Sequence, residues 1–388
     1  MTTATEKEPT KKEEKKEDPR PAIMKKLFKL AADKGIKLVR GSELKSFQYV
    51  SSGLPQIDAL GGACIGRFTV IYGPEGSGKS TYLYRQIAAF QRTFPDKIPC
   101  LVDAEQRIEP TWMQAQGVDT ENLAIIQGHK TMEEFCNAAR QLACSGLISY
   151  IAIDTISAMK PAIMFQETNT EKNILNRDHV AKDAVKITQF IGLINADIFN
   201  NNVACIIVAQ ARTHGIGGRV TYLGLSGGYM LKHMATQIWQ FMQLKSAGDV
   251  TYENITVDSK PVKVVTAFKI RALLEKDTGP NPRRVAILPF VVGVGFDDIE
   301  SVIGSGLRFG CIEETGKARF RWVDTNGEEH KLHGRANVMD YFKAAPLEIE
   351  RLKEAVAITH HKMAGTKTSD PEPIEEQVWV SEDDEEQS

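Results

Sequence analysis

The sequence predicts an α/β protein built on a mostly parallel sheet with helices on both faces. Short apolar runs rich in β-branched residues alternate with segments of helical periodicity between residues 67 and 208. These runs are four to six residues long and continuously apolar, as expected for strands covered on both sides. A glycine-rich turn separates the first strand from the first helix of the series. Sheets of this class bind ligands at the carboxyl ends of their strands.

The composition is that of an ordinary globular protein. The chain has 388 residues, of which 42% are hydrophobic and 25% charged, and this length allows two or three domains of ~100–200 residues each. No apolar run approaches the ~20 residues of a membrane helix, and the charged start from Glu6 onward is unlike a secretory signal. The six cysteines are scattered without a C-x-x-C pair. We therefore expect reduced thiols in a cytoplasmic protein with no membrane partner.

The charge is unevenly distributed along the chain. Residues 370–386 hold nine carboxylates and no Lys or Arg; without them the formal charge of the remainder rises from −2 to +7. A basic body with an acidic tail is compatible with a nucleic-acid partner, although such tails can also merely solubilise.

Five segments are expected in order. Residues 1–20 are polar and aperiodic and should be disordered, whereas residues 21–49 hold an amphipathic helix, 21–34, and a linker. The helix is too small to hold a core of its own, so a partner or a neighbouring domain must cover its apolar stripe. Residues 50–295 should form the core domain, residues 296–365 a smaller α/β domain and residues 366–388 the disordered acidic tail.

The core elements follow from periodicity. Strands are predicted around 69–71 and at 98–102, 123–126, 150–153 and 203–208, then as hairpin-connected strands at 238–244, 262–270 and 284–289. Helices are predicted after the glycine-rich turn and at 109–116, 131–145 and 178–200. In the last domain we expect a helix at 298–305, a hairpin from 318–323 through an Asn-Gly turn, and helical residues 337–358 interrupted near Pro346.

The glycine-rich turn satisfies the pattern G-x-x-x-x-G-K-[ST]. Glycines allow backbone N–H groups to point inward, and the N-terminus of the following helix favours an anion. Lys79 can place its ammonium on the outer phosphates of ATP, and Ser80 offers a hydroxyl to Mg²⁺. The predicted nucleotide-binding residues are Gly73, Pro74, Glu75, Gly76, Ser77, Gly78, Lys79, Ser80 and Thr81.

Further polar residues stand where predicted strands end. Asp154 follows four apolar residues and can hold Mg²⁺ opposite Ser80, or can simply cap a turn. Glu105 suits a general base that orients the attacking water; Asp103 competes for that role, and spacing does not separate them. Gln210 can sense the γ-phosphate through its amide, or can begin a polar loop.

Over residues 23–358 the chain resembles a bacterial RecA-type homologous recombinase, including the phage versions. The matching segments are YGPEGSGKST, LVDAEQRIEPTWMQAQGVDTENL, YIAIDTISAM, IIVAQAR, SGGYMLKHMAT and, in the last domain, GRANVMDYFKAAPLEIERLKEAV. Many ATPases share any one of them, whereas the ordered set is specific. The resemblance implies a RecA-type core and a DNA-dependent ATPase that forms helical filaments on single-stranded DNA. It also implies homologous pairing and strand exchange in recombination and repair.

The resemblance assigns roles to individual residues. Glu105 becomes the water-activating carboxylate, Lys79 a catalytic phosphate contact and Gln210 the switch between ATP and DNA. Glu109 and Trp112 match positions that bracket the adenine, where an indole face can stack.

A second set would act across a subunit boundary. Lys269 and Arg271, in FKIRA, match a Lys-x-Lys pair that reaches the nucleotide of the neighbouring subunit. The Arg keeps the charge and can bind phosphate as a fork. ATP would then lie between subunits, and the helix at 21–34 would dock on the next copy.

Two loops, 160–177 and 212–226, would line the DNA groove. Cationic side chains neutralise phosphates, and an aromatic side chain can wedge between bases. The expected DNA contacts are Lys172, Arg177, Arg212, Thr213, His214, Arg219 and Tyr222. Expected partners are single-stranded and duplex DNA, further copies of the chain, and single-strand-binding and loader proteins.

The sequence departs from the family pattern at three places. His233 stands where the bacterial proteins have an interface aromatic, the first loop is longer and lacks glycines, and residues 274–284 form an unusual insertion. The residues for repressor co-cleavage cannot be matched, so the sequence does not tell whether the protein has that activity. The competing hypotheses are a hexameric motor on the same core and a regulatory ATP-binding module without DNA.

Overall fold

The computed structural model describes residues 19–44, 47–128, 131–162, 178–216, 219–225, 229–257, 260–279 and 283–364. Contacts within the chain divide it into two units, Met1–Phe47 and Gln48–Ser388. The tails predicted to be disordered lie largely outside the described residues, as does most of the first predicted DNA loop. Within the described part, every helix is too short or too polar to span a bilayer.

The first unit contains α1 (Arg20–Asp33), which occupies the predicted amphipathic helix, and the short 3-10 helix η1 (Gly41–Glu43). After α1 the chain turns back, and the backbone N–H of Ile36 donates to the carbonyl of Ala31 over 2.8 Å. Ala31 is the buried residue of this helix.

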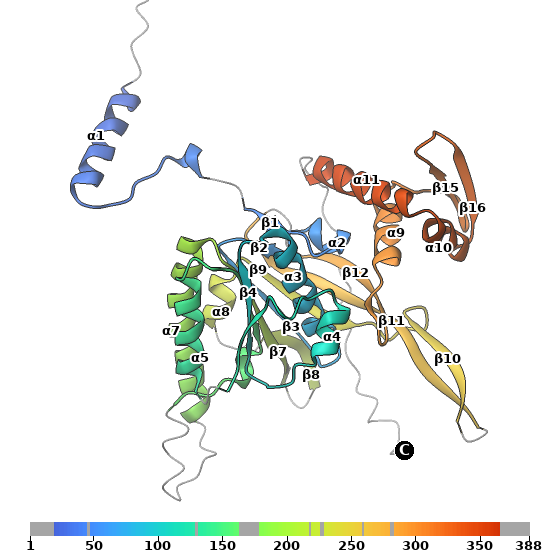
Figure 1. Ribbon diagram of the computed structural model, residues 1–388, viewed down its shortest axis with the longest axis horizontal. Coiled ribbons are helices and arrows are strands. Elements are labelled where there is room, and N and C mark those ends of the chain that lie inside the picture. The colour runs from blue at the N-terminus through green and yellow to red at the C-terminus, as the bar shows by residue number, and fades with distance from the viewer. Residues whose placement is uncertain are drawn as a thin grey trace, which may run out of the picture. The chain divides into compact units, whose positions relative to one another are not determined.

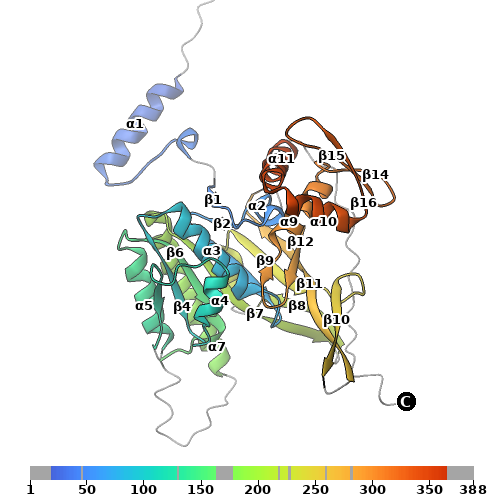
Figure 2. The same ribbon diagram turned by 45° about the vertical axis from the view of Figure 1, so that its right-hand side comes forward.

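The second unit is organised around a large sheet (Figures 1 and 2). Its strand order is β13-β12-β11-β9-β3-β7-β6-β4-β5, with β10 added to β11 and β8 added to β7. The six strands from β9 to β5 pair in parallel, which confirms the predicted fold class. Their bounds are β3 (Phe68–Gly73), β4 (Ile98–Asp103), β5 (Ala124–Ile126), β6 (Ile148–Asp154), β7 (Ala204–Ile216) and β9 (Gln237–Gln243).

Helices cover both faces of the parallel region, and each face buries its own apolar cluster. On one face, α3 (Lys79–Thr93) buries Leu83, Ile87 and Phe90, and the ring of Phe90 stacks on Tyr150 with 4.5 Å between centroids. The other face is covered by α5 (Met132–Ala143), α7 (Asp178–Asn201) and α8 (Tyr229–Met234) (Figure 1). Shorter elements complete the unit: β1 (Tyr49–Val50), α2 (Pro55–Asp58), β2 (Ala63–Cys64), α4 (Pro110–Ala115) and the 3-10 helix η2 (Ile156–Ala158).

The antiparallel part of the sheet differs from expectation in two ways. The strand β7 was expected to end near Gln210, but it continues to Ile216 because it pairs with β8 (Arg219–Leu225) as a hairpin. The strand expected at 262–270 is the longer β11 (Lys260–Asp277), which pairs with the unpredicted β10 (Val250–Val257). On its other side it pairs with β12 (Arg284–Val291), which is followed by β13 (Gly295–Phe296).

The C-terminal part forms its own small core. Its elements are α9 (Asp298–Arg308), β14 (Glu313–Gly316), β15 (Arg319–Val323), β16 (Glu329–His333), α10 (Arg335–Ala344) and α11 (Pro346–Ala364). The last two helices meet at Pro346, where an interruption was predicted. Trp322 and Phe342 pack edge to face inside this core. A 2.6 Å ion pair from Arg85 of α3 to Asp298 ties α9 to the main sheet.

All six cysteines are free thiols. Cys64, Cys100, Cys136 and Cys205 are buried, as expected for core thiols. Burial raises the pKa of Cys64 to about 11 and that of Cys100 to about 12. These side chains are therefore neutral packing groups at ordinary pH.

Candidate nucleotide-binding site

The register of the parallel strands gathers polar residues at one edge of the sheet. Gly73 at the end of β3 lies directly across from Gln210 in β7, and Asp103 of β4 lies across from Asp154 of β6. The strands follow one another in the order β3-β7-β6-β4. Residues distant in sequence therefore share the edge at which ligands of such sheets bind.

The turn between β3 and α3 requires glycine at two positions. A Cβ atom on Gly73 would collide with the backbone carbonyl of Phe241, so only glycine allows this close approach to β9. Gly78 has a φ of +80° and precedes the first residue of α3. A side chain there would be strained and would meet Ile270 at 2.6 Å. The turn is thus packed closely against β9, through Phe241, and against β11, through Ile270.

The ammonium of Lys79 lies over this turn. Its Nζ donates to the carbonyls of Gly73 and Pro74 over 2.9 and 2.5 Å. Burial lowers the pKa of Lys79, and the carboxylates of Asp154 and Glu75 oppose that effect. A partly desolvated cation whose hydrogen bonds go to two carbonyls and, at 3.4 Å, to Ser77 Oγ can exchange these partners for phosphate oxygens.

Beside it, Ser80 and Asp154 form a pair of oxygen donors. Ser80 Oγ donates to Asp154 Oδ2 over 2.7 Å. Burial raises the pKa of Asp154, and the hydrogen bond from Ser80 opposes that rise. Hydroxyl and carboxylate oxygens are the donors that Mg²⁺ takes up, and a divalent cation would also compensate the buried carboxylate. The donor set therefore fits Mg²⁺.

The two carboxylates after β4 have different surroundings. Asp103 is buried and accepts hydrogen bonds from Gln106 N at 2.9 Å and Gln127 Nε2 at 2.8 Å. Glu105 is about one quarter exposed and has Arg107 at 3.5 Å. Asp103 therefore holds the turn together, whereas the Glu105 carboxylate remains open to solvent at the sheet edge.

The two residues expected at the adenine lie at α4. Glu109 caps this helix, accepting from Thr111 N at 3.1 Å and Thr111 Oγ1 at 2.7 Å. These hydrogen bonds lower the pKa of the Glu109 carboxyl. Trp112 is half-buried and packs against the core beneath α3.

Lys269 and Arg271 are not brought to Lys79 of the same chain. Between them Ile270 belongs to the apolar cluster under α3, so the alternation of β11 turns both cations toward the opposite face. Lys269 pairs with Asp249 at 3.0 Å. Burial lowers the pKa of Arg271, and the nearby Tyr72 opposes that effect.

The second predicted DNA loop forms much of the β7–β8 hairpin. Its register pairs Arg212 with Gly224, Thr213 with Leu223, His214 with Tyr222 and Ile216 with Arg219. The hairpin begins one residue after Gln210, so a strand at the nucleotide edge continues into the loop. Lys172 and Arg177 of the first loop lie outside the described residues.

Two contacts near the site were not expected from the sequence. Tyr72 Oη donates to Glu275 Oε2 over 2.6 Å and accepts from Gln240 Nε2 at 3.2 Å. Lys276 Nζ caps the end of α8 by donating to the carbonyls of Lys232 and His233 at 2.9 and 2.7 Å. Residues 274–277 of the predicted insertion thus extend β11, and Lys276 anchors α8. Only the unusual length of this segment could have drawn attention to it.

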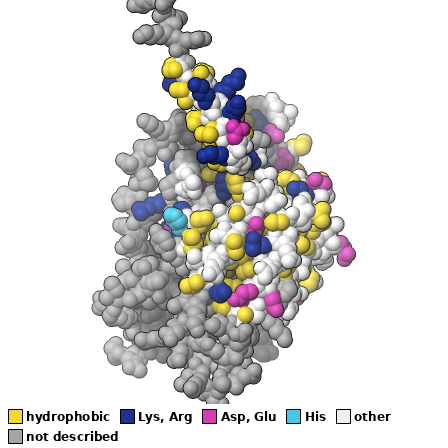
Figure 3. All heavy atoms as spheres, turned by 90° about the vertical axis from the view of Figure 1, so that its left-hand side faces the viewer, with side chains coloured by type: hydrophobic (Ala, Val, Ile, Leu, Met, Phe, Trp, Pro, Cys, Tyr) yellow, Lys and Arg dark blue, Asp and Glu magenta, His cyan; other side chains and the backbone are white. Residues whose placement is uncertain are grey.

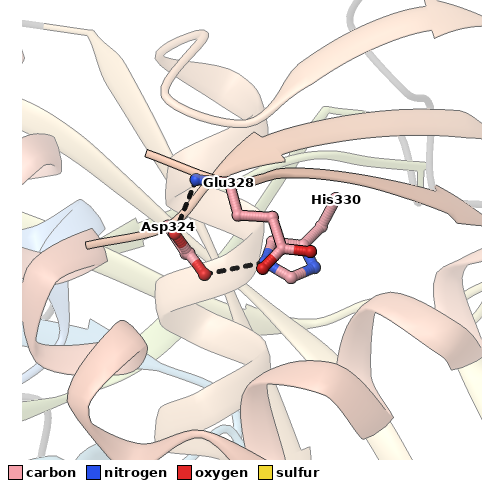
Figure 4. A group of neighbouring side chains, drawn as sticks. All are labelled: Asp324, Glu328 and His330. Carbon is pink, nitrogen blue, oxygen red and sulfur yellow. Dashed lines mark hydrogen bonds and ion pairs between the residues drawn. The ribbon is translucent and has the colours of Figure 1, made fainter. Parts of the chain in front are cut away.

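A third group of polar side chains lies in the C-terminal part (Figure 4). One ligand atom from each of Asp324, Glu328 and His330 lies within 4.8 Å of the others. Asp324 Oδ1 accepts from the backbone N–H of Asn326 and of Glu328, and its Oδ2 lies 2.9 Å from His330 Nε2. These hydrogen bonds lower the pKa of Asp324 and close the turn between β15 and β16. The group therefore has a structural role.

Known proteins resemble this chain over most of its length. A family model described as the RecA N-terminal domain matches residues 22–274. Protein RecA of Nostoc punctiforme is 29% identical over 315 residues, which cover 79% of each chain. Protein RecA of Thermus thermophilus is 27% identical over 303 residues, covering 76% of this chain and 80% of the relative. That of Corynebacterium aurimucosum is 26% identical over 317 residues, covering 80% and 76%.

Proposed function

The chain belongs to the RecA family, and on that premise we propose that it is a DNA-dependent ATPase that forms helical filaments on single-stranded DNA. In these filaments it catalyses homologous pairing and strand exchange during recombination and repair. The observation that carries the proposal is the shared sheet edge, where the phosphate-binding turn, the Ser80–Asp154 pair and Gln210 meet. In this proposal, β7 carries Gln210 at the ATP site and continues into the hairpin that faces DNA.

In this proposal each residue of the edge has a distinct task. The turn from Gly73 to Thr81 holds the phosphates with backbone N–H groups, and Lys79 supplies a charge to the outer ones. Ser80 and Asp154 hold Mg²⁺, which neutralises charge on the β- and γ-phosphates when bound. Glu109 and Trp112 bracket the adenine.

Glu105 accepts the proton of the water that attacks the γ-phosphate. Its carboxylate is about one quarter exposed, it forms an ion pair with Arg107 on the surface, and its charge also acts on Lys79. Asp103 is unsuited to that task, because both of its oxygens hold neighbouring groups. A base must be free to approach the water that it activates.

Assembly would complete the site from a second copy. Lys269 and Arg271 lie on the sheet face opposite α3, where they can reach the phosphates of a neighbour's nucleotide. The exposed apolar side chains of α1 support a contact with a further copy in the same polymer. ATP would then join subunits, which links hydrolysis to the state of the filament.

The DNA would run along the two loops, 160–177 and 212–226. In the second, Arg212 and Arg219 neutralise phosphates while Tyr222 stacks on a base, and Gln210 transmits the presence of the γ-phosphate. Sequence is read by pairing between the strands, so backbone contacts and stacking suffice. Single-strand-binding and loader proteins are the further partners that this activity requires.

Electron microscopy with ATP, Mg²⁺ and single-stranded DNA tests the proposal. Helical filaments together with DNA-stimulated ATP hydrolysis are the expected result. Closed rings would point instead to a hexameric motor. Hydrolysis that is indifferent to DNA would point to a regulatory ATP-binding module, and either result would overturn the proposal.

A further inference from the structure

Three polar side chains meet on the face of the sheet opposite α3. Tyr72 of β3 is 1% exposed, and its Oη donates to Glu275 Oε2 over 2.6 Å while it accepts from Gln240 Nε2 at 3.2 Å. The three residues come from β3, β11 and β9, which are neighbours in the sheet. A hydrogen bond from a buried hydroxyl to a carboxylate is strong because the acceptor is charged. The bond therefore ties β11 to β3 across the strand that lies between them.

The side chain of Glu275 reaches Tyr72 because β11 bulges at this point. The pairing of β11 with β9 shifts its register between Leu274 and Lys276, which leaves Glu275 as the extra residue. Strict alternation along a strand would send Glu275 and Lys276 to opposite faces. Instead both act on the face away from α3, where Glu275 accepts from Tyr72 and Lys276 donates to the carbonyls at the end of α8. The bulge thus fixes the end of β11 at two points.

The same strand presents Arg271 near the nucleotide edge. In register, Tyr72 lies across from Gln240, whereas Arg271 lies across from Met242, two residues nearer the carboxyl end of β9. The alternation of β11 puts the side chain of Arg271 on the same face as Tyr72. The two groups also interact, since Tyr72 opposes the lowering of the pKa of Arg271 by burial. Along the strands, Tyr72 therefore lies between Arg271 and Glu275.

The position of Arg271 depends on the strand that carries it. Lys269 has an ion pair of its own, with Asp249 at 3.0 Å. Within the part of the chain that the structure describes, no hydrogen bond or ion pair holds the guanidinium of Arg271. A displacement of about 1 Å in a group that meets the reacting atoms can cost on the order of 10²-fold in rate. Whatever anchors β11 therefore decides how well this guanidinium is aligned.

We propose that Tyr72 and Glu275 are positioning residues for Arg271, because their hydrogen bond fixes β11 where the guanidinium can meet the phosphates of a neighbouring subunit's ATP. The inference rests on the proposed function, from which it takes the contact of Arg271 with a neighbour's nucleotide. Tyr72 directly precedes Gly73. The strand that carries one subunit's phosphate-binding turn thus also places the cation that serves the next subunit. A single buried hydroxyl links the two nucleotide sites that each subunit contacts.

The substitution Tyr72→Phe removes the hydroxyl and keeps the ring. We expect isolated subunits to bind ATP as before and DNA-stimulated kcat to fall roughly 10- to 100-fold, since the guanidinium loses its alignment. Glu275→Ala breaks the same bond from its exposed end and should reproduce the loss, even if Tyr72→Phe fails to fold. Glu275→Gln keeps an oxygen acceptor and should retain most of the activity. Isothermal titration and an ATPase assay measure the two quantities, and parent turnover in both Tyr72→Phe and Glu275→Ala would overturn the inference.

Tyr150→Phe is the matched control for the loss of a buried hydroxyl. Tyr150 is also buried in the parallel sheet, in β6, and its hydroxyl has no hydrogen-bond partner among the described residues. Removing that hydroxyl should leave turnover unchanged. An equal decrease in Tyr150→Phe and Tyr72→Phe would indicate a general effect on the sheet and would contradict the positioning role.

Mixed subunits show whether Tyr72 acts on its own subunit's nucleotide or on the neighbour's. When Tyr72→Phe is mixed with Lys79→Ala, an intact turn from the first variant can face a correctly placed Arg271 from the second. Hydrolysis should then exceed the sum of the two variants measured separately. Both variants keep the exposed apolar and basic side chains of α1 (Figure 3), which serve the other proposed contact between copies. A defect confined to the subunit's own turn would not recover, and this result would count against the inference.

A double variant separates the inference from the proposed function. If Tyr72 acts through Arg271, Tyr72→Phe/Arg271→Ala should hydrolyse ATP no more slowly than Arg271→Ala alone. Losses that multiply would overturn the positioning role even if filaments form on DNA. If hydrolysis is instead indifferent to DNA, the proposed function fails. The same comparison, made on that hydrolysis, then still decides whether Tyr72 acts through Arg271.

Discussion

Ser80 Oγ donates a 2.7 Å hydrogen bond to Asp154 Oδ2, which joins the start of α3 to the end of β6 across 74 residues of sequence. The two residues come from different βα connections. Neither residue alone supplies enough oxygen atoms to bind a metal ion, whereas the pair brings a hydroxyl and a carboxylate together. The bond partly compensates a carboxylate whose pKa is raised by burial. The protein therefore keeps these two oxygen donors together at some cost in stability.

Asp154→Asn should make the ligand-free protein more stable at neutral pH. The ionised carboxylate disfavours folding above its raised pKa, by about 1.4 kcal/mol for each unit of the rise. As pH falls through that pKa the parent takes up a proton and gains stability, so the advantage of the variant shrinks. The stability advantage of the variant should vanish below the ordinary pKa of Asp, ~3.9. Urea unfolding across this pH range measures the difference. A constant advantage at every pH would contradict the burial argument.

Lys79→Ala should weaken ATP binding without unfolding the protein. The loss of a charged hydrogen bond to phosphate costs ~1.5–3 kcal/mol, or about 10- to 150-fold in affinity. Isothermal titration with ATP and Mg²⁺ measures it, with Lys343→Ala on α10 as the matched surface control. ATP affinity equal to that of the control would remove Lys79 from the phosphate site.

Glu105→Ala should lower turnover by roughly 10²- to 10⁴-fold and leave ATP binding intact, because a general base acts on the water and not on the nucleotide. Filaments of this variant should persist on DNA. A DNA-stimulated ATPase assay gives the rate, and pelleting with labelled DNA gives the lifetime.

Asp103→Ala is the comparison for that prediction. It removes the acceptor for Gln106 N and Gln127 Nε2, so we expect ~1–3 kcal/mol of lost stability. Full stability with turnover as slow as in Glu105→Ala would reverse the two assignments.

Arg271→Ala should leave ATP binding by isolated subunits unchanged but reduce DNA-stimulated hydrolysis, by ~10³-fold or more if the guanidinium meets phosphate in the transition state. Mixing it with Lys79→Ala should restore part of the activity. An intact turn from one variant then faces an intact arginine from the other. If no mixture of the two variants recovers ATP hydrolysis, Lys79 and Arg271 do not act on the same nucleotide from two subunits.

Tyr222→Ala should weaken single-stranded DNA binding by about 5- to 150-fold, since stacking on one base is worth ~1–3 kcal/mol. Tyr252→Ala, on the exposed strand β10, is the control and should bind DNA normally. If Tyr222→Ala also binds normally, the stacking role passes to another hairpin residue such as His214, its partner in register.

The predicted alternation of strands and helices was confirmed where local pattern and tertiary environment agree. Most of the parallel strands are nearly continuous apolar runs, with β9 the exception because it carries Gln237, Gln240 and Gln243. The helices α3, α5 and α7 carry apolar stripes that face the sheet. The hairpin of β7 and β8 was missed because residues 211–225 are rich in glycine, which is uncommon inside strands. β10 was missed for a related reason: its side chains are largely exposed, and only pairing with β11 makes it a strand.

At the nucleotide edge, motif order alone pointed to the phosphate-binding turn and to carboxylates near it. A turn of this kind is encoded within a few neighbouring residues, because its glycines set the local backbone and the side chain of its lysine reaches carbonyls of the same turn. The difference between Asp103 and Glu105 is not encoded locally. It arises because Gln127, brought in from beyond β5, occupies an oxygen of Asp103, while Glu105 stays accessible. The direction in which Arg271 points is likewise set by the packing of Ile270 under α3, since a strand's alternation has no preferred face until one side is buried.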